Sequence, residues 1–185
     1  MRALAEFIMR GRVQATLIVA GCAALPFLFW LSAAAGSLVL LRRGPRDALS
    51  ILSWALLPAL VWWFIGEPRT LMVLLGTLGL ALMLRAGQSW NRVLLVSVAL
   101  GVVYGVVLGT VFREPIGAMA QELEKLLPQV LNGLYDKLSD VERARLGALI
   151  APVLTGLIAA LMQVVSVLAL IIGRYWQALL YNPGG

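Results

Sequence analysis

The side chains of this sequence that could bind a small molecule are mostly aromatic, with one pair of opposite charges. Indole and phenol rings offer an apolar surface together with one hydrogen-bonding group, and a carboxylate beside a guanidinium can orient a polar substituent. Such a set suits a small, largely uncharged ligand. Each candidate could instead be an interface anchor, part of a turn salt bridge or a packing residue, which is the alternative we favour. The six candidate ligand-binding residues are Trp30, Trp62, Trp63, Glu67, Arg69 and Tyr104.

Groups for catalysis and metal binding are scarce in the sequence. It contains no histidine, which is the commonest metal ligand and general base, and Cys22 is its only cysteine. The sequence has no P-loop, zincin motif or nucleophile elbow. We therefore predict that the protein is not an enzyme and that it binds no metal and no cofactor.

Composition indicates that these residues lie in a membrane protein. Hydrophobic residues make up 61% of the 185 residues, and several runs approach the roughly 18–20 residues needed to span a bilayer. The basic residues behind the net charge of +6 are scattered, without the patch typical of nucleic-acid-binding proteins. We predict an all-α integral membrane protein with a single membrane domain over residues 1–185. Its expected partner is the lipid bilayer, and we do not expect it to bind nucleic acid.

The first long apolar run leaves two topologies open. Residues 13–41, between Arg12 and Arg42, carry no charge, and as one helix they would extend ~43 Å against a hydrocarbon core of about 30 Å. Pro26 could mark a turn between two shorter spans, although proline kinks within single membrane helices are also common. Two spans would place Trp30 at the outer interface, where tryptophan is enriched, whereas one span would bury it in the core.

The short loops favour two spans over one. In the two-span arrangement the compact arginine-rich loops at 42–46 and 85–92 both lie in the cytoplasm, as the positive-inside rule predicts. We therefore predict a six-helix transmembrane bundle in a bacterial inner membrane, with both termini in the cytoplasm. The expected spans are about 8–25, 27–41, 48–65, 70–84, 93–112 and 146–172.

The two ends of the chain have further interpretations. A signal peptide could explain the arginines that precede the first apolar run, but the run continues past the small residues at 32–35, which is too long for an ordinary signal. At the other end, the final "YNPGG" is typical of an internal turn, so the sequence could be a piece of a longer protein.

Small residues recur every four residues on two of the expected spans. This spacing lets helix backbones approach closely, either within one bundle or between two proteins. We expect packing within the bundle for both sets, with docking of a partner helix as the alternative. The helix-packing or docking candidates are Thr16, Ala20, Ala24, Gly101, Gly105 and Gly109.

The one polar region, residues 113–145, is expected outside the cytoplasm between the fifth and sixth spans. Its apolar residues recur at steps of three and four, which predicts an amphipathic helix, and Pro128 is expected to break that helix into two pieces. Ser139 and Glu142 are spaced as a capping box that starts the last helix. The segment could be a connector at the membrane interface or a cap over the outer mouth of the bundle, and we favour the connector.

The stretch "LPFLFWLSAAAGSLVLLRRGPRDAL", residues 25–49, resembles the YybS-like family of uncharacterised bacterial inner-membrane proteins. More remotely, the chain is similar to the substrate-capture (S) components of energy-coupling-factor vitamin transporters. The likeness lies in a helix, a proline-containing outer turn at Pro26, a short second helix and a glycine-bearing cytoplasmic turn at Gly44. The long segment after the fifth span departs from the S-component pattern.

This resemblance implies an S-component-like fold with an outward-opening site formed by the six candidate residues. It also implies that Ala20 and Ala24 dock on a coupling membrane protein that works with ATPases. The rival hypothesis is a non-transporting membrane scaffold or assembly factor that packs against partner helices in an envelope complex.

Overall fold

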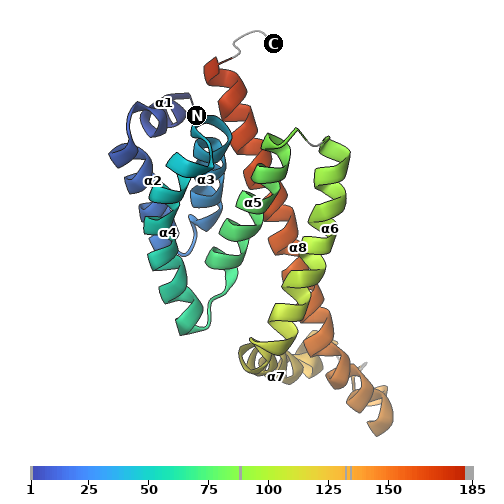
Figure 1. The fold of residues 1–185 in the computed structure, drawn as a ribbon. Coiled ribbons are helices and arrows are strands. Elements are labelled where there is room, and N and C mark those ends of the chain that lie inside the picture. Colours follow the sequence, from blue (N-terminus) through green and yellow to red (C-terminus); the bar gives the residue numbers. More distant parts are fainter. Residues whose placement is uncertain (1, 88, 132, 134, 182–185) are drawn as a thin grey trace. The chain divides into compact units, whose positions relative to one another are not determined.

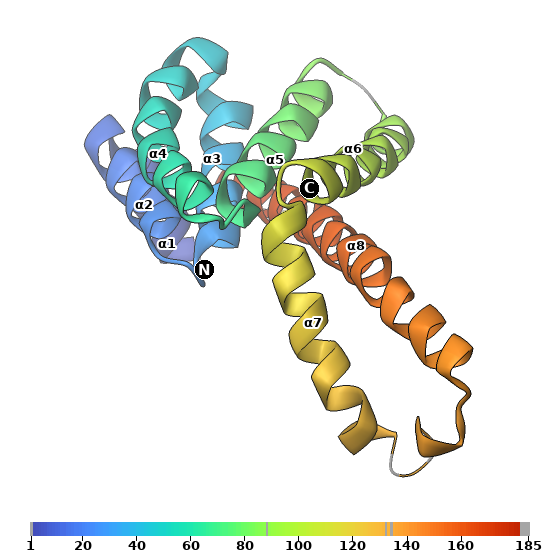
Figure 2. The same cartoon turned by 90° about the horizontal axis from the view of Figure 1, so that it is seen from below.

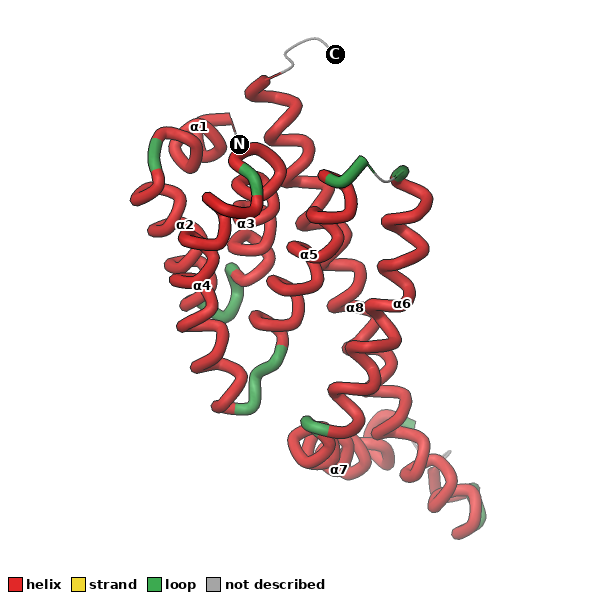
Figure 3. Tube along the Cα trace, viewed as in Figure 1, coloured by secondary structure: helices red, strands yellow, loops and turns green. Residues whose placement is uncertain are grey.

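The computed structural model describes residues 2–87, 89–131, 133 and 135–181, and these residues form helices and turns without a strand. The all-helical prediction is therefore confirmed (Figures 1 and 3). The elements are α1 (Arg2–Arg10), α2 (Arg12–Ala24), α3 (Phe29–Arg43), α4 (Pro45–Ile65), α5 (Arg69–Arg85), α6 (Trp90–Thr110), α7 (Arg113–Val130), a 3-10 turn (Tyr135–Lys137) and α8 (Asp140–Tyr181).

The chain divides into two compact units, which we describe separately. Unit 1 comprises residues 1–100 and 162–185, and unit 2 comprises residues 101–161. Helices α6 and α8 each contribute one part to unit 1 and the other part to unit 2. Unit 1 therefore contains α1–α5 together with the ends of two helices that unit 2 shares.

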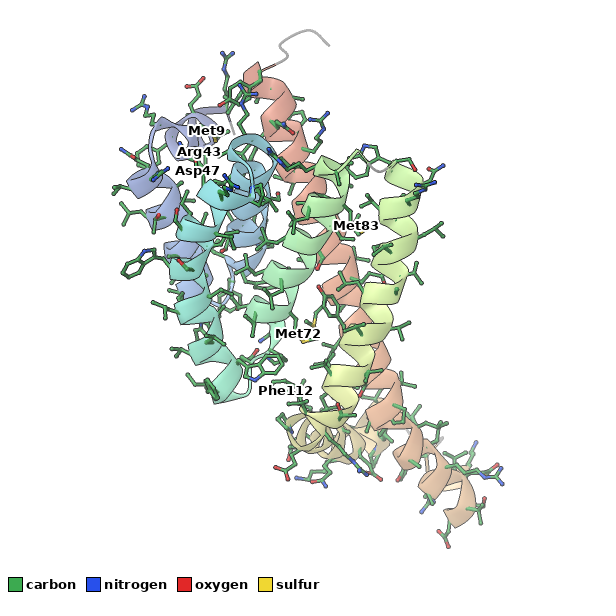
Figure 4. All side chains as sticks on the ribbon, in the orientation of Figure 1. Met9, Arg43, Asp47, Met72, Met83 and Phe112 are labelled. Atoms are coloured by element: carbon green, nitrogen blue, oxygen red, sulfur yellow. The ribbon has the colours of Figure 1, made fainter. Side chains whose placement is uncertain are left out.

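The chain reverses direction at Pro26, so one long helix over residues 13–41 is ruled out. Helix α2 ends at Ala24, and α3 begins at Phe29. Two contacts place the α1–α2 junction beside the α3–α4 turn: Arg12 Nη2 of α2 lies 2.8 Å from Asp47 Oδ1 of α4, and Arg43 Nη2 of α3 donates to Met9 O of α1 at 2.9 Å. Figure 4 shows Met9, Arg43 and Asp47 gathered at this end of unit 1.

The expected first segment, residues 8–25, is wrong at its start. The helix is interrupted at Gly11, which has an extended backbone with φ −166° and ψ 170°. Glycine has the largest conformational entropy to lose in a helix, so an interruption is least costly there. The preceding residues form the separate amphipathic helix α1, which buries Ala5 and Ile8.

Helix α3 forms the centre of unit 1. All ten residues from Ser32 to Leu41 are buried, and α3 packs against α2, α4 and α5. Close packing is possible because the middle of the helix consists of alanine, glycine and serine. A Cβ added to Gly36 would lie 3.1 Å from Leu52 Cδ2, which leaves almost no room for a larger residue.

Three helices are long and apolar enough to cross a membrane, namely α4, α6 and α8. They correspond to the expected spans 48–65, 93–112 and 146–172, although α6 ends at Thr110, two residues before the expected boundary. Helices α2, α3 and α5 have 13, 15 and 17 residues. At about 1.5 Å per residue they extend roughly 20–26 Å, less than the ~30 Å hydrocarbon core, so these three spans stay predictions.

In unit 2, the predicted break at Pro128 is wrong. Helix α7 continues through Pro128 to Val130, and the Leu131 amide still bonds to the Leu127 carbonyl at 2.9 Å. Proline has no N–H, so it cannot bond to the carbonyl four residues earlier. The last turn of a helix can lose this one hydrogen bond and still persist. Figure 2 shows α7 leading to the loop from which α8 returns.

The predicted capping box at the start of α8 is confirmed. The backbone amide of Ser139 donates to Glu142 Oε2 at 2.8 Å, and the Glu142 amide donates to Ser139 Oγ at 3.4 Å. These reciprocal bonds satisfy two amides that the helix itself leaves without a carbonyl partner. They also hold the pKa of Glu142 below its usual value, chiefly through the Ser139 backbone amide.

Candidate functional site

Five of the six predicted ligand-binding residues lie near the α2–α3 and α4–α5 turns of unit 1. Trp30 is half-buried in the first turn of α3. Trp62, in the last turn of α4, donates its indole N–H to the Ala24 carbonyl at 3.3 Å. This bond joins the two turns, because Ala24 is the last residue of α2. Trp63 is also half-buried near the end of α4.

Glu67 and Arg69 pair with each other within the α4–α5 turn. The Arg69 Nε atom donates to Glu67 Oε2 at 2.7 Å, and Arg69 Nη2 contacts the same oxygen. Both side chains remain about half exposed. Gly66 has a φ of 98°, a left-handed conformation that glycine adopts without strain. The pair is therefore placed to fix the turn, and a ligand would have to compete with it for either charge.

Tyr104 belongs to unit 2 and is 2% exposed there. It lies in α6, with Leu108 one turn later also buried. The structure thus places Tyr104 in unit 2 as a buried residue, and it gathers the other five predicted residues at one end of unit 1.

Three buried hydroxyl groups at the centre of unit 1 bond to backbone carbonyls. Ser32 Oγ donates to Val19 O at 2.7 Å and so links α3 to α2. Thr77 Oγ1 donates to Ser166 O at 3.2 Å and links α5 to α8. Ser37 Oγ donates to Ala34 O at 2.8 Å within α3. These hydroxyls hold helices in register, and their donors are already used.

The two sets of small residues have different surroundings. On α2 the buried face is Ala15, Val19, Cys22 and Ala23. Thr16 and Ala20 are half-buried and Ala24 is exposed, so this stripe is only partly covered within unit 1.

In unit 2, the glycine stripe of α6 faces α8. A Cβ built on Gly105 would lie 3.8 Å from Ala159 Cβ, and one on Gly109 would lie 3.9 Å from Thr155 Cγ2. Both are ordinary van der Waals separations, so these two glycines pack within the protein. Gly101, at the boundary of the unit, is half-buried.

A cavity of about 450 Å³ lies at the end of unit 1 opposite to Trp30, Trp62 and Trp63. It is formed by the ends of α3, α5 and the unit 1 part of α8, together with the first residue of α6. Three of its side chains are arginines, and none is acidic. The residues that line it are Leu41, Arg42, Leu84, Arg85, Trp90, Arg174 and Gln177.

Two hydrogen bonds hold Arg85 in place in the lining of this arginine-lined cavity. Its Nη1 donates to the carbonyl of Leu40 at 3.0 Å and to that of Leu41 at 2.7 Å, so it caps the last turn of α3. Gly44 follows that turn with a φ of 89°, and a Cβ there would lie 3.0 Å from Arg85 Nη2. The glycine provides both the backbone conformation and the space for the guanidinium.

Arg42 and Arg174 are each held by one side-chain contact among the described residues, whereas Arg85 makes two hydrogen bonds. The guanidinium carbon of Arg42 lies 3.8 Å from the centroid of the Tyr181 ring, and Arg174 Nη1 donates to Gln177 Oε1 at 2.6 Å. Within the described part of the chain, no carboxylate forms a salt bridge with Arg42, Arg85 or Arg174.

This cavity was not predicted from the sequence. The bias of short loops put the loops that hold Arg42 and Arg85 in the cytoplasm, where these arginines served only to orient the chain. The three arginines come from helix ends that are 43 to 132 residues apart in the chain. Only the tertiary arrangement shows that they converge.

Comparison with known proteins finds no match: no protein-family model, no curated protein and no solved structure is similar to this chain. The resemblance to YybS-like proteins and to S components therefore stays a prediction. Only the residues at the two ends of unit 1 indicate what each end could bind.

Proposed function

We propose that this chain is a multi-pass protein of a bacterial inner membrane, in which α2, α3, α4, α5, α6 and α8 cross the bilayer. The support comes from the three long apolar helices and from the large apolar side chains that they leave exposed. In water such a surface would be costly, whereas lipid covers it without penalty. Exposed examples on α4 and α6 are Leu57, Val61, Phe64, Leu95 and Val98.

The shortness of α3 is compatible with this proposal. Mismatch between helix length and bilayer thickness matters for the surface that touches lipid. Ten consecutive residues of α3 are buried among other helices, so protein rather than lipid surrounds most of it. The lengths of α4, α6 and α8 then determine the fit to the bilayer.

Cysteine labelling tests the proposed orientation. In a Cys22→Ala background, Phe27→Cys should react with an impermeant thiol reagent in intact cells, and Arg46→Cys should react only after lysis. Both positions are exposed in the structure. Arg46 is preferable to its neighbour Gly44, whose positive φ and contact with Arg85 leave no room for a side chain. Reaction at position 46 from outside would contradict cytoplasmic termini.

Within that membrane setting, we propose that the protein is a non-transporting scaffold or assembly factor that packs against partner helices. One observation carries this proposal: the hydroxyls inside unit 1 are bonded to backbone carbonyls that hold helices together. A capture site for a ligand needs polar groups free to bind it. Ser32, Ser37 and Thr77 have their donors used in this way, which suits a structural role, although the fully buried Trp176 Nε1 of unit 1 has no partner among the described residues.

Substrate capture in the manner of an S component is the second candidate. It is favoured by the reversal at Pro26 and the glycine turn at Gly44, which follow the order of elements expected of that fold. The partly uncovered stripe at Thr16, Ala20 and Ala24 would then contact the coupling protein. The ligand would be small and mostly uncharged. It would bind at the end of unit 1 that holds Trp30, Trp62 and Trp63.

Purification from membranes separates the two candidates. A co-purifying coupling protein with its ATPases supports capture, and envelope-assembly proteins support the scaffold. The combined change Ala20→Leu and Ala24→Leu should abolish the association while the protein still accumulates in the membrane. Equal loss of accumulation would instead assign the stripe to internal packing.

A further inference from the structure

We propose that the arginine-lined cavity of unit 1 binds a phosphate-bearing anion, supplied by the headgroup of an anionic phospholipid. This inference rests on the proposed membrane location, and it is independent of whether the protein is a scaffold or a capture component. Basic pockets between the ends of transmembrane helices are the kind of site at which anionic lipid headgroups bind.

The charge of the cavity is the first argument. Arg42, Arg85 and Arg174 bring three permanent positive charges to one space of about 450 Å³ whose lining has no acidic residue. Three other arginines of unit 1 are each paired with a carboxylate: Arg2 with Glu6, Arg12 with Asp47 and Arg69 with Glu67. Three guanidinium groups that share a cavity repel one another, and an anion between them removes that repulsion.

The geometry of the donors is the second argument. Arg85 is held in place by the two carbonyls at the end of α3, so it supplies a fixed charge. Arg42 rests against a tyrosine ring and Arg174 against a glutamine, and neither contact uses the whole donor set of a guanidinium. Planar guanidinium groups can bind phosphate oxygens through two parallel N–H bonds. Gln177 adds a neutral side chain beside them.

The surroundings favour a lipid over a free phosphate ion. Trp90 lines the cavity, and tryptophan is enriched at the depth of lipid headgroups. Beyond it, the α6 residues Leu94, Leu95 and Val98 expose their side chains within the same unit. A headgroup held by the arginines could therefore place its acyl chains along an apolar surface, whereas inorganic phosphate would leave that surface unused.

Thermal unfolding of the full chain in a neutral detergent tests the proposal. Titration with dioleoylphosphatidylglycerol should raise the unfolding midpoint, because a ligand that binds only the folded state stabilises it. Dioleoylphosphatidylcholine should have little effect, since its own cation neutralises the phosphate. The double variant Arg42→Gln and Arg174→Gln should weaken the apparent affinity for phosphatidylglycerol about tenfold or more. Arg85 is left unchanged because it caps α3.

A matched control separates the cavity from general charge. The double variant Arg10→Gln and Arg46→Gln removes the same charge from exposed arginines of unit 1 outside the cavity, and it should keep the wild-type response. Arg42→Lys with Arg174→Lys should bind with intermediate affinity, because lysine keeps the charge but loses the planar pair of donors. If the cavity double variant does not accumulate, single Arg174→Gln gives the same comparison.

Two results would overturn the proposal. An equal response to phosphatidylglycerol in the cavity variant and in the control variant would show that lipid binds elsewhere. Stabilisation by inorganic phosphate alone that matches phosphatidylglycerol, and that depends on Arg42 and Arg174, would reject the lipid as the source. Neither result concerns partner proteins. If the lipid proposal fails, purification still distinguishes the scaffold from the capture function.

Discussion

The two units of this protein stabilise their helices in different ways. In unit 1 the central helix α3 is buried over ten consecutive residues, and serine and threonine hydroxyls bond from one helix to the carbonyls of another. In unit 2 only Ile116 and Ala120 are buried among the residues of α7. Its described side-chain hydrogen bonds, such as those of Ser139 and Thr155, join residues close in sequence. These side-chain hydrogen bonds therefore join distant helices in unit 1 and residues close in sequence in unit 2, where α6 meets α8 by van der Waals packing at Gly105 and Gly109.

This difference predicts how each unit responds to the same kind of substitution. Helix α8 allows a direct comparison because it contributes to both units.

The exposed side of α7 bears on the role of this helix. Its apolar residues Met119, Leu123, Leu126 and Val130 remain exposed. Such a surface fits a connector at the membrane interface, which lipid covers without a specific shape.

The largest effect is expected for Gly173→Ala in the unit 1 part of α8. A Cβ at this position would lie 2.9 Å from the Ala34 carbonyl oxygen and would also collide with Ser37 Oγ. Because the α3 backbone cannot move aside, we expect a loss of about 1–3 kcal/mol in stability, measured by thermal unfolding in detergent.

Gly156→Ala is the matched control in the unit 2 part of α8. No atom lies within 4 Å of the Cβ that alanine would add. Alanine favours helix over glycine by up to ~1 kcal/mol, so stability should stay the same or rise slightly. Similar destabilisation by both substitutions would show that the two parts of α8 are packed alike and would remove the contrast.

A smaller effect is expected for Thr77→Val, which keeps the shape of the side chain and removes the hydroxyl. The lost bond joins α5 to the Ser166 carbonyl of α8, and such bonds between membrane helices contribute ~0.6 kcal/mol on average. Thr155→Val in unit 2 removes a bond to Ala151 in its own helix and should change stability less. An equal or larger loss for Thr155→Val would contradict the division into distant and local contacts.

The smallest and most local effect is expected for the capping box. Ser139→Ala should speed amide hydrogen exchange several-fold in the first turn of α8, because the Ser139 hydroxyl no longer accepts from the Glu142 amide or donates to the Glu142 carboxylate. The unfolding midpoint should hardly change. If exchange in this turn stays as slow as in the wild type, the cap is not what holds the start of α8.

The capping box should also respond to pH. Because the folded-state pKa of Glu142 is lowered, its contribution is fully present above the ordinary pKa of a glutamate. It is lost as the pH falls through the lowered value, when protonation weakens acceptance from the Ser139 amide. The protection of amides in the first turn of α8, relative to their intrinsic exchange rate at each pH, should therefore fall in acid. Glu142→Gln, which cannot ionise, should remove that pH dependence.

Sequence reasoning succeeded where the signal was local and strong. Pro26 marks the reversal between α2 and α3, and the spacing of Ser139 and Glu142 gives the cap, because each depends on residues close in the chain. Pro128 was misjudged since the effect of a proline depends on how much helix remains after it. Here only two residues remain, and the last turn persists.

The arginine-lined cavity could not be predicted in the same way. It requires three helix ends to meet, and no spacing in the sequence encodes that meeting. Likewise, no sequence pattern shows what the interior hydroxyls contact, and only the packed structure shows that they reach carbonyls. Charge and periodicity indicate which side of a helix or membrane a residue prefers, but they do not give its neighbours.

The position of α3 at the centre of unit 1 has a consequence for the order in which the protein is made. Its end is capped by Arg85, which follows the Leu41 carbonyl by 44 residues, and Ser37 lies 3.5 Å from the Ala169 carbonyl, 132 residues later. At roughly 5–20 residues per second, ribosomes need about 7–26 s to complete that second interval. During this time the Ala34–Ser37 side of α3 lacks its final neighbour and exposes small residues, so a nascent chain that stalls before α8 offers this side to any other helix nearby.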